Sequence, residues 1–362
     1  GVVEVEEREG MSSSSGVVRD LGFTSLAKRY HDLLHCNILL TSDLHNALDK
    51  VLMLVEWVCA YPEKIHCILN PGDFSQMSTA DQSSGSKVCC GEADTMTLLQ
   101  ELEGICPLVL YVPGNHDPCT LFGMDPPEGF LPLHRFQESR TNTSSPVASQ
   151  SDPPSVSQSL WTPSPEPPVE VDPKTVLPYM SWCSRNLHLG TIRLLEGLSV
   201  VGIGGSVPGF LMQGEEPETQ IWDGFPYTTS ESVHPDIDTI DEFLSQRKEE
   251  CAGPHGPPHR VLLMSHFPPD ESKTSFSARE SGSCVRGGSA HLRSLVEKQS
   301  DLLIGHIHGH IHNAFGVDSI AGIPVINPGS LSEGYFGILH LGRDDTTSPW
   351  QVEGFDLHRL PV

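Results

Sequence analysis

The sequence predicts an α/β fold built in layers. Apolar runs of strand length alternate with helical patterns in the first third of the chain, and short strands follow one another in the last third. Four apolar runs also stop abruptly at polar residues, namely those at residues 38–41, 65–69, 108–112 and 261–264. We interpret each of these runs as a buried strand whose end carries chemically active side chains.

Further elements follow from periodicity and turn residues. Asn46 is expected to cap a helix, because apolar residues recur at helical spacing after it: Leu48, Val51, Leu52, Val55 and Val58. Other helices are expected at residues 95–102, at 239–247 and after Ser289, and other strands at 198–203, 302–304, 323–326, 336–341 and 351–355. Trp222, Phe225 and Tyr227 are expected in a loop, where packing is favoured over stacking on a substrate.

Composition sets the domain organisation. A length of 362 residues is typical of about two domains, but 30 prolines and 33 glycines make one core with an insertion equally compatible. Residues 1–18 form an acidic, Ser-rich tail, and residues 136–174 form a Pro/Ser-rich insertion; both are predicted to be disordered. We therefore expect one domain at 19–362, interrupted by that insertion. The insertion is either a solvated loop or a segment that binds a protein partner.

Charge and cysteine content exclude several classes of partner. The formal net charge of −25 and the lack of any basic cluster argue against a nucleic acid polymer or an anionic membrane as partner. Ten irregularly spaced cysteines do not form a disulfide framework, which favours a reducing, cytoplasmic environment. The N-terminal residues do not resemble a signal peptide, and no apolar run is long enough to span a membrane.

The polar residues after the strands form a set of candidate metal ligands. In chain order they are Asp43, His45, Asp73, Asn115, His266 and a pair from the tandem GHIHGHIH at residues 305–312. Carboxylate, imidazole and amide donors together suit Mn, Fe, Zn or Ni, of which we favour Mn. Side chains two residues apart on an extended segment point to one side, so Asp-x-His and His-x-His can each serve one site.

Seven ligands are too many for one tetrahedral zinc, and they suit two metal ions bridged by a carboxylate. A hydroxide bridging the two ions is the expected nucleophile, because metal binding lowers the pKa of water to about 7. His116 is the expected acid for the departing oxygen, with the neighbouring Asp117 carboxylate orienting its imidazole.

The motifs Asp-x-His, Gly-Asp, Gly-Asn-His-Asp, a single His after a strand and Gly-His-x-His, in this order, resemble the calcineurin-like metallophosphoesterase family. The resemblance implies a four-layer α/β/β/α sandwich of two mixed sheets flanked by helices, with a dinuclear metal site at strand ends. It also implies two ligand sets: Asp43, His45, Asp73 and the last His for one ion, and Asp73, Asn115, His266 and the preceding His for the other.

The tandem histidines leave two assignments. The run after His312, up to the Asn-Pro-Gly-Ser turn at residues 327–330, resembles the usual family spacing and favours His310 and His312. The strand at residues 302–304 runs directly into the first copy and favours His306 and His308. We choose His310 and His312 as the metal ligands.

Departures from other branches of the family narrow the expected function. Phe74 follows Gly72-Asp73 where protein phosphatases have a different continuation, and the glycine loop at residues 204–206 and the 327–330 turn look like those of small phosphodiesterases. We therefore expect a phosphodiesterase acting on a small or nucleotide-like phosphoester. The alternatives are a phosphomonoesterase and a protein-interaction scaffold that uses the same fold. Completeness of the ligand set argues for an enzyme.

Overall fold

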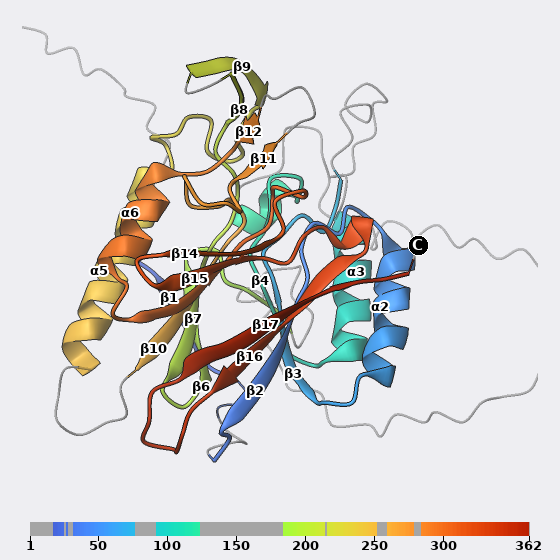
Figure 1. Cartoon of the computed structure of the whole chain (residues 1–362), viewed down its shortest axis with the longest axis vertical. Helices are drawn as coiled ribbons and strands as arrows, with labels where there is room; N and C mark the ends of the chain where they lie inside the picture. Colours follow the sequence, from blue (N-terminus) through green and yellow to red (C-terminus); the bar gives the residue numbers. More distant parts are fainter. Residues whose placement is uncertain are drawn as a thin grey trace, which may run out of the picture.

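The computed structural model describes residues 17–24, 27, 32–76, 92–123, 184–213, 216–251, 259–278 and 284–361. Two large sheets pack face to face, with α2 (Leu48–Ala60) and α3 (Glu92–Ile105) outside one sheet and α5 (His234–Cys251) and α6 (Ala290–Lys298) outside the other (Figure 1). This arrangement confirms the expected four-layer sandwich. The expected tail and the expected insertion fall outside the described residues, apart from residues 17 and 18. Val18 is buried against the seven-stranded sheet.

The six-stranded sheet carries the first three ligand segments. Its strand order is β17-β16-β2-β3-β4-β5, and β2 to β5 run parallel. The bounds are β2 (His35–Leu40), β3 (Ile65–Asn70), β4 (Val109–Tyr111), β5 (Ser184–Asn186), β16 (Tyr335–Gly342) and β17 (Gln351–Arg359). Because β2, β3 and β4 are parallel neighbours, the residues that follow them meet at one edge of the sheet.

The seven-stranded sheet carries the remaining ligand segments. Its order is β1-β6-β7-β10-β13-β15-β14, and β7, β10, β13 and β15 run parallel. The bounds are β1 (Arg19–Phe23), β6 (Gly190–Leu195), β7 (Leu198–Ile203), β10 (Arg260–Ser265), β13 (Leu303–Ile307), β14 (Gly316–Ile320) and β15 (Ile323–Asn327). The residues after β10 and β13 therefore also share one edge.

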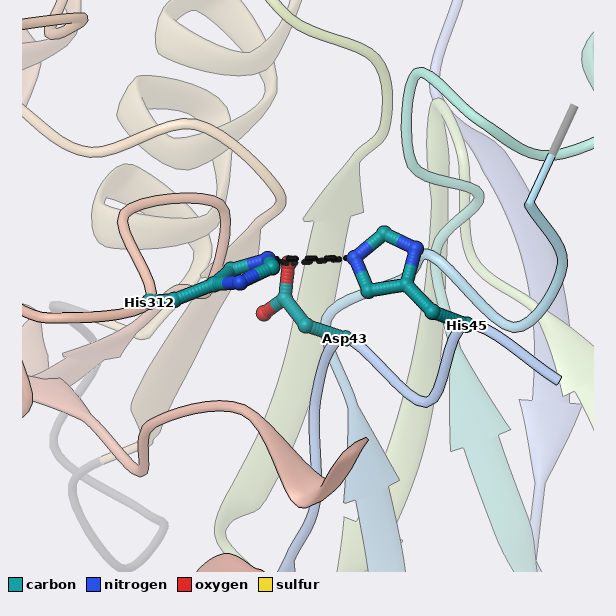
Figure 2. A group of neighbouring side chains, drawn as sticks. All are labelled: Asp43, His45 and His312. Carbon is teal, nitrogen blue, oxygen red and sulfur yellow. Dashed lines mark hydrogen bonds and ion pairs between the residues drawn. The ribbon is translucent and has the colours of Figure 1, made fainter. Parts of the chain in front are cut away.

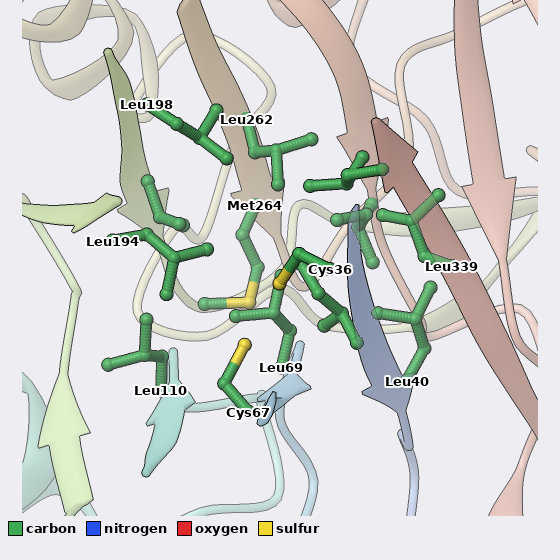
Figure 3. Close-up of a cluster of buried hydrophobic side chains, with 14 of the residues drawn as sticks. Cys36, Leu40, Cys67, Leu69, Leu110, Leu194, Leu198, Leu262, Met264 and Leu339 are labelled. Atoms are coloured by element: carbon green, nitrogen blue, oxygen red, sulfur yellow. The ribbon is translucent and has the colours of Figure 1, made fainter. Parts of the chain in front are cut away.

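The core between the sheets makes these edges rigid. Leu40, Leu69 and Leu110 from one sheet pack against Leu262 and Met264 from the other (Figure 3). Both faces of each sheet are covered. A second apolar cluster joins the outer face of the six-stranded sheet to α2 and α3, and a third joins the outer face of the seven-stranded sheet to α5 and α6. Strands buried on both faces require continuous apolar runs, which explains why their sequences do not alternate.

A third, four-stranded antiparallel sheet was not expected. It has the order β11-β12-β8-β9, with β8 (Gly209–Gln213), β9 (Glu216–Trp222), β11 (Phe276–Ala278) and β12 (Cys284–Arg286). Figure 1 shows it beyond the upper ends of β7 and β10. The sequence does not predict these strands, because they are short, rich in Gly, Ser and Glu, and lack a clear apolar pattern.

Two helix starts test the expected caps. Ser289 caps α6 as expected, and its hydroxyl accepts a hydrogen bond from the Leu292 N–H at 3.2 Å. The expectation for Asn46 was wrong: α2 begins at Leu48 after Ala47, and Asn46 adopts a left-handed φ of 63°. Asn46 belongs to the turn that presents His45, so the demands of the ligand loop prevail over the local capping preference.

Candidate metal centre

Every expected ligand segment directly follows a strand of the two sheets. Asp43 and His45 follow β2, Asp73 follows β3, and Asn115 follows β4. His266 follows β10, and the segment with His310 and His312 follows β13. Backbone hydrogen bonds join neighbouring segments, for example from the Asp43 N–H to Gly72 O at 3.0 Å and from the Gly309 N–H to His266 O at 3.1 Å. Between the two sheets, the His310 N–H donates to Oδ2 of Asp43 at 3.1 Å, and the Gly205 N–H donates to Pro113 O at 2.8 Å.

The first group of side chains, here called the Asp43 cluster, consists of Asp43, His45 and His312. Figure 2 shows the two imidazoles facing each other across the carboxylate. Their Nε2 atoms lie 3.0 Å apart, and Nε2 of His312 lies 3.2 Å from Oδ1 of Asp43. Three ligand atoms within 4.8 Å of one another form a site that can hold one metal ion.

The second group, the Asp73 cluster, consists of Asp73, His266 and His310. Nε2 of His266 lies 3.2 Å from Oδ2 of Asp73 and 3.0 Å from Oδ1 of Asn115, so the Asn115 amide joins this cluster. Oδ2 of Asp73 also lies 3.8 Å from Nε2 of His45. Asp73 therefore stands between the two clusters, where a bridging carboxylate has to be.

The donor set of the Asp73 cluster fits a cation. Nδ1 of His266 lies 2.7 Å from the carbonyl oxygen of Pro71, so this nitrogen carries the proton that donates to it. Burial lowers the pKa of His266, but Asp73 outweighs it and raises the pKa to about 9, so Nε2 carries a proton toward Asp73 in the metal-free site and a lone pair once that proton is displaced. Three acceptors that face one another need a proton or a metal ion between them.

Backbone strain accompanies both clusters. Asp43, His45, Asp73 and His310 all have left-handed φ values, of 52°, 44°, 58° and 70°. Non-glycine residues with positive φ are uncommon and store conformational energy of about 1–3 kcal/mol each, which the surrounding structure has to offset. Their concentration at the strand ends supports a functional role for these loops.

The glycines of the motifs are required by close approaches. A Cβ at Gly114 would overlap the Asp73 carboxylate, and a Cβ at Gly309 would overlap the Ser42 hydroxyl and come within 2.5 Å of Oδ2 of Asp43. The glycines of the Gly-Asn and Gly-His motifs therefore leave the room that the ligand loops need to approach each other.

Electrostatics keep both carboxylates ionised. Burial raises the pKa of Asp73, but His266 and His116 outweigh it and lower the pKa to about 2. Burial opposes ionisation of Asp43 as well, and His312, followed by His266 and His45, still holds its pKa well below the ordinary value. Burial lowers the pKa of His310 to about 3, so its ring is neutral and able to donate a lone pair.

Asp117 has a different role from the expected one. Its Oδ2 accepts hydrogen bonds from the N–H groups of Asp73 at 2.9 Å and Gly114 at 2.8 Å, and its Oδ1 accepts one from the Ser75 N–H at 3.0 Å. The carboxylate thus ties the Asp73 and Asn115 loops together instead of orienting the His116 imidazole. Burial, followed by repulsion from Asp73, raises the pKa of Asp117 to about 7.

His116 lies beside both clusters. Its backbone N–H donates to Oδ1 of Asp73 at 2.8 Å, and its ring centroid lies 5.1 Å from that of His45 in an edge-to-face arrangement. The side chain is half-buried, so it borders the ligands and remains accessible.

The first histidine copy lies outside the two clusters. Nε2 of His306 lies 2.7 Å from the Ser265 hydroxyl, and Nε2 of His308 lies 2.8 Å from the Thr274 hydroxyl. Both rings are buried. They tie β13 to β10 and to the segment after His266, which supports the loop that carries His310 and His312.

The N–H groups of the glycine loop at residues 204–206 are hydrogen-bonded to acceptors within the protein. Its three N–H groups donate to Nδ1 of His188 at 3.0 Å, to Pro113 O at 2.8 Å and to Phe225 O at 2.7 Å. All three N–H groups are therefore paired within the protein. The loop packs behind Pro113 and supports the Asn115 segment from the other sheet.

Sequence reasoning missed residues that hold the ligand loops. The Asn327 amide donates to Ile311 O at 2.9 Å and to Ala314 O at 3.2 Å, and the Ser330 hydroxyl donates to Asp43 O at 2.8 Å. Glu333 lies 3.7 Å from Nδ1 of His312. The sequence predicts a turn at residues 327–330 but not these hydrogen bonds. The Asn and Ser of the turn, whose side chains can bond to nearby backbone, were the signal that could have revealed them.

Comparison with known proteins decides the family. The family model described as calcineurin-like phosphoesterase matches residues 36–314, which contain all the candidate ligands. The chain belongs to the calcineurin-like phosphoesterase family. This phosphoesterase is therefore a phosphoric ester hydrolase of a class that depends on two divalent metal ions, and the structure has two side-chain clusters that could each hold one ion.

One solved structure supports the fold of this phosphoesterase, and two others are similar to a lesser degree. One crystal structure matches 91% of the chain and 100% of its own length at 14% identity, with a TM-score of 0.51, which shows the fold. The protein TT1561 of Thermus thermophilus matches 91% of this chain and 100% of its own at 13% identity, with a TM-score of 0.45. A dimetal phosphatase from Danio rerio matches 88% and 98% at 12% identity, with a TM-score of 0.39.

Comparison with curated proteins gives no match. Within the described residues, no helix combines the length and apolar character needed to cross a membrane.

Proposed function

We propose that this phosphoesterase hydrolyses a phosphodiester of a small or nucleotide-like molecule. The ligands of its metal centre would be Asp43, His45, Asp73, Asn115, His266, His310 and His312. The position of Asp73 carries the proposal: Oδ2 lies 3.2 Å from Nε2 of His266 and 3.8 Å from Nε2 of His45, within reach of both clusters. No other described carboxylate is paired with histidines of both clusters in this way.

The residues divide the chemistry among them. Two divalent ions, when bound, would supply Lewis acidity and an activated water for attack on phosphorus. Asp43 and Asp73 remain ionised and supply negative charge, while His45 and His310 supply neutral nitrogens. His116 borders both clusters and protonates the departing oxygen as the bond to phosphorus breaks. Asp117 keeps the loops that carry Asp73 and Asn115 in register.

The charge around the centre favours a diester over a monoester. The ion pairs of Asp43 and Asp73 are all with histidines, and none is with a Lys or Arg of the described residues. A monoester dianion brings one more negative charge than a diester and benefits more from such cations. Mixed oxygen and imidazole donors support Mn as the preferred ion.

A substrate comparison tests the reaction class. We expect the Mn-loaded protein to turn over bis(p-nitrophenyl) phosphate with a higher kcat/KM than p-nitrophenyl phosphate. A preference for the monoester would instead identify a phosphomonoesterase. Turnover of neither substrate by protein that contains two Mn ions would contradict the proposal.

The role of His116 is tested through the leaving group. His116→Ala should impair a cyclic nucleotide, whose alkoxide leaving group needs a proton, about tenfold more than bis(p-nitrophenyl) phosphate, whose leaving group does not. His35→Ala removes a surface imidazole paired with Glu353 and serves as the control. Equal losses on both substrates would show that His116 is not the acid.

The expectations of a reducing cytoplasmic environment and of a protein partner for residues 136–174 stay predictions.

A further inference from the structure

Trp222, at the end of β9, links the unexpected third sheet to the metal centre. Its indole ring lies edge-to-face against the His310 imidazole, with ring centroids 5.0 Å apart and planes at 87°. On another side His310 meets the His266 ring, at 4.9 Å and 62°. The His310 imidazole is therefore held between an aromatic ring and a second candidate ligand.

Two glycines create the space for the indole. A Cβ at Gly209, which pairs with Trp222 across the β8–β9 ladder, would overlap the ring atoms. A Cβ at Gly287, just after β12, would lie 2.5 Å from Cζ2 of the indole. The indole N–H donates to Val207 O at 3.1 Å. Strand β8, the segment before it and the residue after β12 thus define one position for this side chain.

The four candidate histidine ligands differ in the partners of their ring nitrogens, and the buried Nδ1 of His45 has no hydrogen-bond partner among the described residues. Nδ1 of His266 meets Pro71 O, and Nδ1 of His312 faces Glu333, as is usual for imidazoles that bind metal through the other nitrogen. His310 has no hydrogen-bond partner on either ring nitrogen among the described residues, and its buried Nε2 is unpaired. Its ring orientation has to come from packing.

We propose that Trp222 is a positioning residue for the metal centre, which fixes the His310 ring so that its lone pair points toward Asp73 and His266. The inference rests on the proposed ligand role of His310. It gives the third sheet a function: the sheet sets the geometry of the Asp73 cluster without touching a metal or the reacting atoms.

Calorimetric titration of chelator-treated protein with Mn²⁺ tests this. We expect wild type to bind two ions, and Trp222→Leu to bind one of them about tenfold or more weakly, the range typical for residues that support a ligand, with the other unchanged. Trp222→Phe keeps an aromatic ring and should recover most of the affinity. Trp57→Phe, in α2 against Tyr61 and Phe336, is the control and should bind as wild type.

A second variant moves the indole without removing it. Gly287→Ala should displace the ring and weaken the same ion, and in both variants the quenching of Trp fluorescence by Mn²⁺ should shrink. If Trp222→Leu does not fold, Gly287→Ala decides by the same criterion. If the folded variants bind both ions with wild-type affinity, the inference about Trp222 is overturned and the proposed function is unaffected. A wild type that binds no Mn²⁺ would overturn it together with the proposed function.

Discussion

Asp117 lies next to the candidate ligands and holds their loops in place through hydrogen bonds to backbone N–H groups. Its two oxygens accept from three N–H groups of the Asp73 and Asn115 loops, and the side chain is fully buried. An amide in its place has one acceptor oxygen, and its NH₂ group would face a backbone donor. A buried donor without a partner costs about 1–3 kcal/mol.

Asp117→Asn is therefore expected to lower the free energy of unfolding by about 1–3 kcal/mol, measured by urea denaturation, and to slow all substrates by the same factor. An Asp117 that oriented the His116 imidazole would behave differently. In that case the variant would lose more activity on substrates with poor leaving groups, as His116→Ala should.

The sequence predicted which polar side chains lie close together, and their roles as metal ligands stay a proposal. Asp43, His45, Asp73, Asn115 and His266 each directly follow an apolar run, and the structure brings all of them to two touching clusters. The partners of Asp117 and the role of Trp222 could not be predicted. Both depend on contacts between segments far apart in the chain, which local pattern does not encode.

At the scale of elements, the buried strands of the two large sheets were predictable from the sequence. The short strands of the third sheet and one turn were not. Runs such as residues 261–264 coincide with strands because burial on both faces demands continuous apolar residues. The third sheet, whose short strands lack an apolar pattern, was missed. The turn at Asn46 was also missed. Its backbone conformation is set by the loop that presents His45 and not by the preference of Asn for helix caps.

Gly309 tests whether close approach of loops is what the Gly-His motif provides. Gly309→Ala should lower activity about a hundredfold, because the new Cβ displaces Ser42 and Asp43, and a shift near 1 Å is enough for such a loss. Gly104→Ala, in α3 where nothing lies within 4 Å, is the matched control and should keep full activity. Activity assays with circular dichroism as a fold check distinguish the two. A fully active Gly309→Ala would contradict the steric account.

At the scale of the whole molecule, two sheets held by one core bring the ligand loops together. His188 belongs to this framework: it is buried, and its Nδ1 accepts a hydrogen bond from the Gly204 N–H behind the Asn115 loop. Burial, aided by Arg19, lowers the pKa of His188 from 6.5 to about 3. The folded state therefore excludes a proton that the unfolded state binds below pH 6.5.

The stability that His188 contributes is fully present above pH 6.5 and is lost as the pH falls toward 3. We expect up to about 1.4 kcal/mol of loss per pH unit from this group. His188→Gln cannot take up the proton, so its free energy of unfolding should fall less steeply between pH 6.5 and 4 in metal-free protein. Parallel pH profiles for the variant and wild type would rule out this role.

The most direct test of the dinuclear centre is metal stoichiometry measured together with turnover of bis(p-nitrophenyl) phosphate. Wild type should hold two Mn ions per chain and turn over the diester. His306→Ala removes a support of the ligand loop and no ligand, so it should still hold two Mn ions and lose less activity than His310→Ala. Asp73→Asn and His310→Ala should lose metal and more than about a hundredfold in activity, since residues that only support a ligand already cost 10- to 100-fold. Metal loss in His306→Ala with retention in His310→Ala would contradict the account.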